Sequence, residues 1–289
     1  MQVKEISALI RLLEDPDETV FYHVKDKILS FGNEVIPLLE SAWETSFEPL
    51  MQKRIENIIH QLQFVNIKTG IREWYLAGGK DLLSGVLFVA KYQYPDLNEE
   101  KIKHFINQLS QDVWLELNDY LTAPEKVKVI NKILYDIHGF SGNKTNFHSP
   151  QNSFINTVLE SKKGNPLSLG IVYLLVCNKL SMPVLGVNLP EHFVLAYIED
   201  NIFKFGQKIE RKDILFYINP FNRGFIFSSV EIDKFIQQIN IMPSESHYLP
   251  CKNTDIVVRM LKNLVISYQK LGYAEKQQEI EELLKVFSE

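Results

Sequence analysis

The sequence predicts an α+β protein that is predominantly helical, with one buried central helix and a small antiparallel sheet. Three observations carry this prediction. Apolar residues recur at three- and four-residue steps over residues 6–62 and 74–137, as in amphipathic helices. Residues 164–180 are apolar along almost their whole length. From residue 184 onward, short runs of β-branched and aromatic residues lie between turn-forming residues, as in antiparallel strands.

The first predicted helices lie within residues 6–62. Asp15 to Asp17 marks one helix end, Gly32 suits a left-handed cap, and Pro37 suits the first turn of the next helix. The runs LIRLLEDPDETV and LSFGNEVIPLLE resemble a HEAT repeat over about one helical hairpin. Because stacked repeats normally need about three units, we favour a helical bundle packed on the next domain over an independent peptide-binding array.

The second helical stretch, residues 74–137, includes a helix that is entered through Thr122, Pro124 and Glu125, as in a capping box. The helical pattern then stops. Residues 139–153, GFSGNKTNFHSPQNS, are rich in Gly, Ser and Asn and have no period, which predicts a loop. A loop of this length is often functional, but it also suits a plain connector, and length alone does not choose between the two.

The buried central helix has a clear predicted start, because Asn165 can cap it and Pro166 suits its first position. Its body has no polar stripe, so we expect protein on all sides of it. The strands that follow are predicted at residues 184–188, 192–198, 202–205 and 216–218.

The final stretch, Asp255 to Phe287, is predicted to form one or two amphipathic helices. It resembles a tetratricopeptide unit through Leu261, Leu264, Tyr268, Gly272 and Ala274. Its charged run, Glu275 to Glu282, is predicted to be a solvated helix face.

Composition and charge exclude several classes of partner. The 31 Lys and Arg against 36 Asp and Glu give a net charge of −5, and no basic run occurs, which argues against nucleic acid. The longest apolar run, Leu169 to Cys177, is far shorter than the ~20 residues of a membrane-spanning helix. The start MQVKEISALIRLL lacks the features of a secretory signal, so we expect a cytoplasmic protein without a membrane partner.

The two cysteines, Cys177 and Cys251, do not suffice for a disulfide framework and show no zinc-ligand spacing with the seven histidines. We expect reduced thiols, with Cys177 buried as a packing residue, and we predict no metal and no cofactor.

Three segments carry a resemblance to a known family: NSFINTVLESKKGNPLSLGIVYL, LSMPVLGVNLPEHFVLAY and YINPFNRG, within residues 152–224. In order and spacing they resemble the transglutaminase-like superfamily and, within it, the SirB-type family, which joins this core to tetratricopeptide-like helices. The resemblance implies a papain- or transglutaminase-like core over residues 71–250, between a HEAT-like region at 1–70 and tetratricopeptide-like helices at 251–289.

The resemblance also implies a site that has lost its nucleophile. In active members a cysteine opens the buried helix, a histidine lies on a following strand, and an Asp or Asn orients the histidine. His192 matches the histidine and Asn219 the orienting residue, but the glycine-x-cysteine falls on Gly164, Asn165 and Pro166. Proline cannot act as a nucleophile, and the SirB-type pattern itself has a glycine-x-proline at this place.

The leading hypothesis is therefore a non-catalytic binding or scaffold protein that offers its old substrate cleft to a peptide or protein. The residues expected to line this cleft are Asn165, Pro166, Pro190, Glu191 and Phe221. Glu191, where relatives commonly have glycine, either raises the pKa of His192 or points to solvent.

Two alternatives stay open. One is a hydrolase or acyl transferase that uses Ser168 with His192 and Asn219, although Ser168 lies two residues beyond Pro166 and hence ~200° around the helix. The other is that the helical ends carry the function and the core is only a structural centre. The sequence names no ligand and no oligomeric state.

Overall fold

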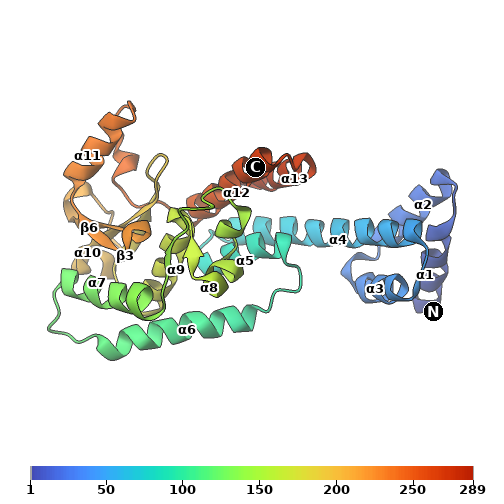
Figure 1. Cartoon of the computed structure of the whole chain (residues 1–289), viewed down its shortest axis with the longest axis horizontal. Coiled ribbons are helices and arrows are strands. Elements are labelled where there is room, and N and C mark those ends of the chain that lie inside the picture. The colour runs from blue at the N-terminus through green and yellow to red at the C-terminus, as the bar shows by residue number, and fades with distance from the viewer. Residues whose placement is uncertain (1, 289) are drawn as a thin grey trace. The chain divides into compact units, whose positions relative to one another are not determined.

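The computed structural model describes residues 2–288, and the chain divides into two compact units, Met1–Gly70 and Ile71–Glu289. Helices predominate in both units, and a small antiparallel sheet lies in the second (Figure 1). The predicted predominantly helical α+β class is confirmed. The finer division into three regions stays a prediction, and helix α4, Pro49–Leu76, contributes residues to both compact units.

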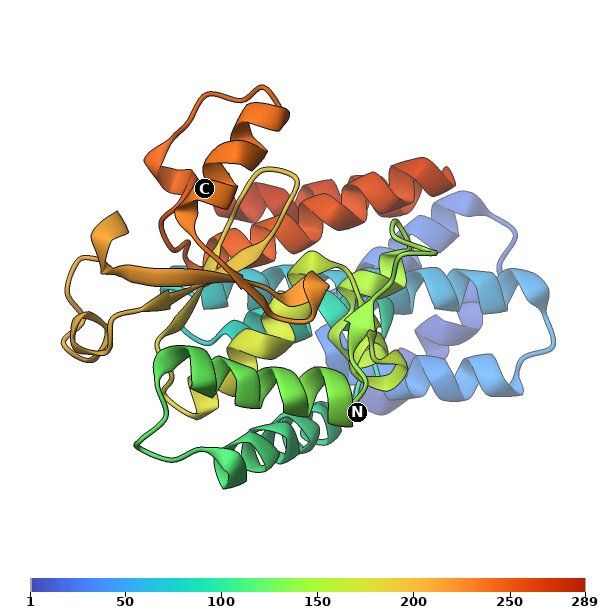
Figure 2. The same cartoon turned by 60° about the vertical axis from the view of Figure 1, so that its left-hand side comes forward.

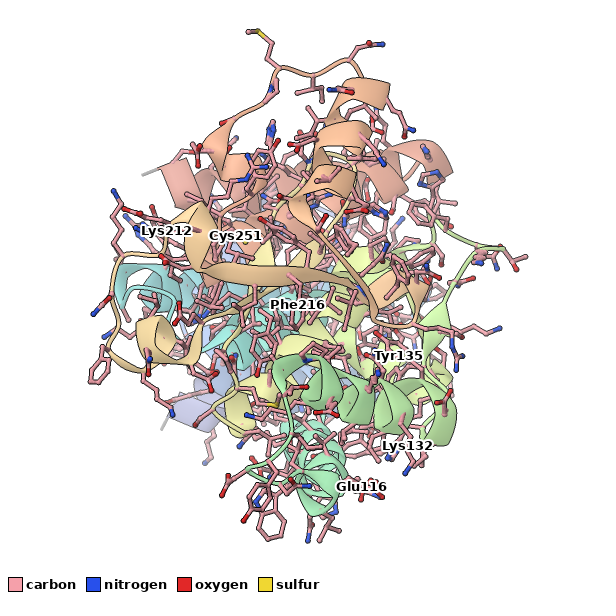
Figure 3. The ribbon with its side chains drawn as sticks, turned by 90° about the vertical axis from the view of Figure 1, so that its left-hand side faces the viewer. Glu116, Lys132, Tyr135, Lys212, Phe216 and Cys251 are labelled. Carbon is pink, nitrogen blue, oxygen red and sulfur yellow. The ribbon has the colours of Figure 1, made fainter. Side chains whose placement is uncertain are left out.

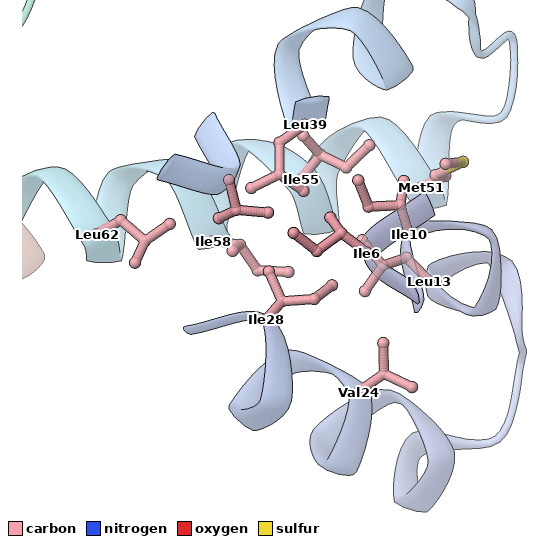
Figure 4. Close-up of a cluster of buried hydrophobic side chains, with 11 residues drawn as sticks. Ile6, Ile10, Leu13, Val24, Ile28, Leu39, Met51, Ile55, Ile58 and Leu62 are labelled. Atoms are coloured by element: carbon pink, nitrogen blue, oxygen red, sulfur yellow. The ribbon is translucent and has the colours of Figure 1, made fainter. Parts of the chain in front are cut away.

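The first unit consists of α1 (Gln2–Arg11), α2 (Glu18–Leu29), α3 (Ile36–Thr45) and the first part of α4. Figure 4 shows its core, where Ile6 and Ile10 of α1, Ile28 of α2 and Ile55 of α4 gather with further apolar side chains. As the sequence predicts, the break before α2 is a cap, since the side chain of Asp17 accepts a hydrogen bond from the backbone N–H of Thr19.

A buried arginine joins α4 to the break between α1 and α2. The guanidinium of Arg54, whose residue is 5% exposed, donates to the carbonyls of Leu13 and Asp15 at 2.9 and 2.7 Å. It also lies 4.1 Å from the centre of the Phe21 ring. Its other terminal nitrogen donates to the carboxylate of Glu18 at 3.0 Å, so the buried charge has a counter-charge within the first unit.

The second unit contains helix α9 (Pro166–Lys179), whose first twelve residues are all buried. The others are α5 (Leu82–Gln93), α6 (Glu99–Glu116), α7 (Ala123–Asn131) with its π-helical continuation Lys132–Ile137, α8 (Ile155–Ser161), α11 (Ser229–Gln238), α12 (Asn253–Leu271) and α13 (Ala274–Lys285). The capping box expected at α7 forms between Thr122 and Glu125, and a left-handed Gly272, which was not predicted as a cap, ends α12.

Side chains near the end of α7 tie this helix to its neighbours, as Figure 3 shows. Lys132 pairs with Glu116 at the end of α6, with 2.9 Å between the charged atoms. The hydroxyl of Tyr135 donates to the carbonyl of Pro220, also at 2.9 Å. The bond from Tyr135 joins residues far apart in the sequence and holds the turn Pro220–Asn222 in place.

The sheet is antiparallel, with the order β3 (Val184–Val187), β4 (Val194–Ile198), β5 (Ile214–Asn219) and β6 (Phe225–Phe227). A separate two-residue parallel pair joins β1 (Ser141–Gly142) to β2 (Lys163–Gly164). Three of the four predicted strands are confirmed, while β6 is an additional strand that the sequence reading missed.

The predicted strand at residues 202–205 is wrong, because these residues belong to a helical turn, α10 (Asp200–Lys204). The N–H of Phe203 donates to the carbonyl of Glu199 at 3.1 Å, and Gly206, with φ of +59°, follows the turn. Both edges of β4 are already occupied by β3 and β5, so the chain that connects β4 to β5 has no place in the sheet between them.

The two faces of the sheet pack on different helices, as Figure 2 shows with orange α11 on one side and yellow-green α9 on the other. Val194, Ala196 and Ile198 of β4 join a cluster with Ile232 and Ile236 of α11. Side chains alternate along a strand, so Leu195 and Tyr197 lie on the opposite face, toward α9. This alternation decides which side chains can reach the start of α9.

The charged run of α13 is only partly a solvated face. Glu275 and Glu281 are exposed, but the carboxylate of Glu279 accepts a hydrogen bond from the hydroxyl of Tyr92 on α5 at 2.6 Å. Within residues 2–288, no helix combines the length and the apolar character that crossing a membrane requires.

Candidate functional site

The start of α9 is closed by its own hydrogen bonds. The side-chain oxygen of Asn165 accepts from the N–H of Ser168 at 2.9 Å, and the Ser168 hydroxyl accepts from the N–H of Asn165 at 3.0 Å. Pro166 takes the first helical position, where no N–H is needed. Ser168 is only 3% exposed, and a Cβ on Gly164 would lie 2.5 Å from its hydroxyl oxygen. The hydroxyl is therefore enclosed within the cap of the helix.

His192 and its neighbour Phe193 face different helices. The imidazole ring of His192 lies 5.7 Å from the ring of Phe235 on α11. Phe193 is fully buried, and its ring fits against two glycines, Gly170 on α9 and Gly186 on β3, where an added Cβ would lie 2.7 Å from it. The side chain that meets α9 is thus phenylalanine, and the histidine lies toward the α11 side.

The environment of His192 favours its neutral form. Burial lowers the pKa of the imidazole, and the positive charge of Arg259 lowers it further. Glu191 is exposed and has a left-handed backbone, with φ of +55°, which accounts for glycine being suited to this position. Of the two outcomes considered for Glu191, the structure agrees with a side chain directed to solvent.

Asn219 ends β5 and caps the short 3₁₀ turn that follows, Pro220–Asn222. Its side-chain oxygen accepts from the N–H groups of Phe221 and Asn222, both at 3.1 Å. Among the described residues, no hydrogen bond links the side chains of Ser168, His192 and Asn219 with one another. Each of the three has its own structural neighbours.

Neither cysteine supplies a nucleophile at the start of α9. Cys177 is fully buried, as predicted, and burial raises the pKa of its thiol far above the ordinary range. Cys251, labelled in Figure 3, is partly buried after the last turn before α12, and its N–H donates to the carbonyl of Gly186 at 2.8 Å. Burial, reinforced by Asp255, raises the pKa of the Cys251 thiol to about 12, so both thiols are protonated at neutral pH.

A cavity of about 690 Å³ lies beside the start of α9. Of the five residues predicted to line a cleft, Asn165, Pro166 and Glu191 line this cavity, whereas Pro190 and Phe221 do not. Phe221 instead packs against Phe147, with 5.9 Å between the ring centres, and Phe147 lines the cavity.

The loop at 139–153 contributes directly to the cavity, through Phe147, His148 and Ser149. It is held by Asn152, which is 3% exposed and donates to the carbonyls of Asn146 and Phe147 at 2.7 and 3.0 Å. The loop therefore forms part of the wall of the cavity.

The longest wall of the cavity is a stripe on α12 that the sequence analysis missed. Its members recur at three- and four-residue steps on one side of the helix: Asp255, Val258, Arg259, Lys262, Asn263, Ile266 and Ser267. In the sequence, polar residues recur beside the apolar stripe of this helix, and such a pattern can indicate a binding surface. The helix was not included in the predicted site because residues 251–289 were assigned to a separate region. Within residues 2–288, no group of three or more His, Cys, Asp or Glu side chains is placed to hold a metal.

Several known proteins are similar to part of this chain. A UPF0162 protein of Xylella fastidiosa (strain 9a5c) is 28% identical over 189 residues, which is 63% of this chain and 63% of that protein. UPF0162 protein YchA of Escherichia coli (strain K12) is 23% identical over 199 residues, 67% of this chain and 69% of that protein. F-box only protein 21 of Mus musculus is 27% identical over 124 residues, 38% of this chain and 20% of that protein.

The match to the Xylella protein spans less than two thirds of that relative's length. No solved structure matches the chain. The family model of the transglutaminase-like superfamily matches residues 100–262, more than half of the chain, from α6 into the first half of α12. The chain therefore belongs to the transglutaminase-like superfamily.

Proposed function

We propose that this chain is a non-catalytic member of the superfamily that binds a peptide or a segment of another protein in the cavity beside α9. The observation that carries the proposal is Pro166, which takes the first position of α9 and lines the cavity. Active members need a nucleophile at that place, and a proline ring offers only an apolar surface.

The bonding of the neighbouring side chains supports the absence of catalysis. A serine nucleophile must lie within ~2.6–3.2 Å of its base, or somewhat further without substrate. The Ser168 hydroxyl is bonded within the cap of α9, and the His192 ring packs on α11. Nothing in this arrangement favours a hydrolase or acyl transferase that uses Ser168, His192 and Asn219.

The shape and lining of the cavity support binding. Its volume falls within the ~300–1,000 Å³ that is typical of ligand sites. Apolar side chains such as Phe147, Leu167 and Ile266 alternate with polar ones such as Asn188 and Asn263. Such a mixture suits a polypeptide segment, which brings both side chains and backbone groups.

The proposal includes finer assignments. The chain is of the SirB type, with Pro166, His192 and Asn219 at the three positions of a papain-like site. Its regions are HEAT-like helices at 1–70, the core at 71–250 and tetratricopeptide-like helices at 251–289, and it acts in the cytoplasm. The boundary at residue 70 is supported by the division into two compact units, and the packing of α12 on α13 supports a helical hairpin after the core.

Activity-based labelling tests the catalytic half of the proposal. The native protein is treated with a fluorophosphonate and, separately, with a peptidyl electrophile that reacts with thiols. We expect no labelling at Ser168, Cys177 or Cys251 that depends on the native fold. Labelling of one of these residues that is lost in His192→Ala would establish a catalytic site and overturn the proposal.

Peptide selection tests the binding half. A random peptide library displayed on phage is selected on the immobilised full chain, and the enriched peptides are synthesised. Ile266→Trp, which places a large ring at the cavity, should weaken their binding at least about tenfold. The matched control is Ile137→Trp, an isoleucine that is 59% exposed and lies outside the cavity. Failure to enrich any peptide, or equal binding by both variants, would refute binding at this cavity.

A further inference from the structure

One cation in the wall of the cavity lacks an anionic partner. Arg259 is half-buried, and its guanidinium donates hydrogen bonds to the described residues through one nitrogen, Nη1. Its acceptors are the neutral side-chain oxygen of Asn188 and the carbonyl of Leu189, the latter at 2.6 Å. Among the described residues, no carboxylate forms an ion pair with Arg259.

A partly buried charge without a counter-charge is costly, because burial removes water that the protein does not fully replace. The direction of the pKa of Arg259 agrees, since burial lowers it. The two hydrogen bonds from Nη1 fix the guanidinium against the β3–β4 connection, while Nη2 and Nε make no hydrogen bond to the described residues. A guanidinium in this state is prepared to accept a planar anion through two parallel hydrogen bonds.

The other charges of the cavity do not supply that anion. The carboxylate of Asp255 accepts the backbone N–H of Lys252 at 2.9 Å, at the start of its own helix. Glu191 is exposed at the left-handed turn before His192. Lys262, one turn beyond Arg259, also lines the cavity and is exposed without an ion pair among the described residues. Two cations on neighbouring turns of α12 therefore face the same space.

We propose that the cavity recognises a peptide segment through a carboxylate, which Arg259 binds directly and Lys262 attracts, with an apolar side chain next to the carboxylate. The inference rests on the proposed binding function and names the chemistry of its ligand.

The size and the lining of the cavity favour a peptide over a small free anion. A lone carboxylate fills only a small part of about 690 Å³. The remaining lining includes the apolar side chains of Phe147, Pro166, Leu167 and Val258, which suit an aliphatic or aromatic residue adjacent to the acidic one. The start of α9 faces the same space, and its dipole adds to the attraction for negative charge.

The test begins from the peptides enriched on the immobilised full chain. We expect them to share an Asp or Glu beside an apolar residue. For one such synthetic peptide, replacing the acid by its amide should weaken binding to the wild-type protein by about ten- to a hundredfold, as for loss of a hydrogen bond between charged groups. This comparison changes only the peptide, so it does not depend on how a protein variant folds.

Protein variants then locate the partner of the carboxylate. Arg259→Gln should weaken the binding of the acidic peptide by a similar factor. As in a double-mutant cycle, the acidic peptide and its amide should bind this variant with almost equal affinity. Lys262→Gln should cost only about two- to fivefold, because that side chain is exposed. Lys128→Gln, an exposed lysine on α7 outside the cavity, is the matched control and should change nothing.

The possible failures are distinct. Enriched peptides without a shared acidic residue, or equal binding of acid and amide peptides, would overturn this inference while leaving peptide binding intact. An acid-to-amide loss that is unchanged in Arg259→Gln would also overturn it, since the carboxylate would then bind elsewhere. Absence of any enriched peptide would instead refute the proposed function itself.

Discussion

The two walls of the cavity differ in how far their polar groups are already bonded. At the start of α9, Asn165 and Ser168 bond to each other and Pro166 has no N–H to satisfy. Across the cavity, Arg259 has only neutral acceptors and Lys262 is free of ion pairs among the described residues. The polar groups at the start of α9 are thus bonded within the protein, whereas the cations on α12 are the groups that we propose to hold the ligand.

On the function that we propose, the two walls separate catalysis from binding. Catalysis in active relatives needs a nucleophile at the start of the matching helix, and Pro166 supplies none there. Binding depends on the shape and charge of a surface, to which α12 contributes the longest wall. We therefore expect substitutions around α9 to change the free energy of unfolding and substitutions on α12 to change the affinity for the ligand.

The largest effect is expected from Phe193, the side chain that meets α9. Its ring is fully buried between Gly170 and Gly186, so Phe193→Ala leaves a space that neither glycine can fill. We expect a loss of about 3–5 kcal/mol in the free energy of unfolding. Urea unfolding measures it, with Phe225→Ala, 58% exposed on β6, as the control at about 1 kcal/mol or less. Similar losses for both variants would show that α9 is not packed as described.

Local signals in the sequence were sufficient to predict the elements around the site. The start of α9 could be read from Asn165 and Pro166, since capping is decided by neighbouring residues. The strand at 202–205 was mistaken because Ile202, Phe203 and Phe205 suit a strand by type. Whether a strand forms there depends on a free edge of the neighbouring strand, and the pairing of β4 with β3 and β5 leaves no free edge on β4.

The site itself was predictable only in part. Asn165 and Pro166 could be predicted because they themselves form the start of the helix. The wall on α12 lies about ninety residues further along the chain. The hydrophobic periodicity of the sequence does not predict such a contact, because the contact depends on tertiary packing. The orientation of His192 was not predicted either. Side chains alternate along β4, and this alternation places Phe193 on the side of α9. The alternation assigns a side to each residue only once the strand is known to lie between two helices.

A smaller effect is expected at Ser168. Ser168→Ala leaves the buried N–H of Asn165 without its acceptor, which should cost about 1–2 kcal/mol of stability in urea unfolding. Affinity for a selected peptide should not change, because the hydroxyl does not line the cavity. Ser228→Ala, which opens the exposed capping box of α11, is the matched control and should cost less, since water can replace that hydroxyl. A loss of peptide affinity in Ser168→Ala would contradict a purely structural role.

The smallest effect concerns the pH dependence of stability, and it links the two walls. Burial and Arg259 lower the pKa of His192, so below the ordinary histidine value of about 6.5 the unfolded chain binds a proton before the folded protein does. Wild-type stability should therefore fall slightly more than that of His192→Asn when the pH is lowered from 7.5 to 5.5. Arg259→Gln should shift the pKa of His192 upward and reduce this fall, which NMR titration of the imidazole measures directly. If His192 instead titrates above its ordinary value, a nearby carboxylate such as that of Glu191 governs the ring, and the charge on α12 does not reach it.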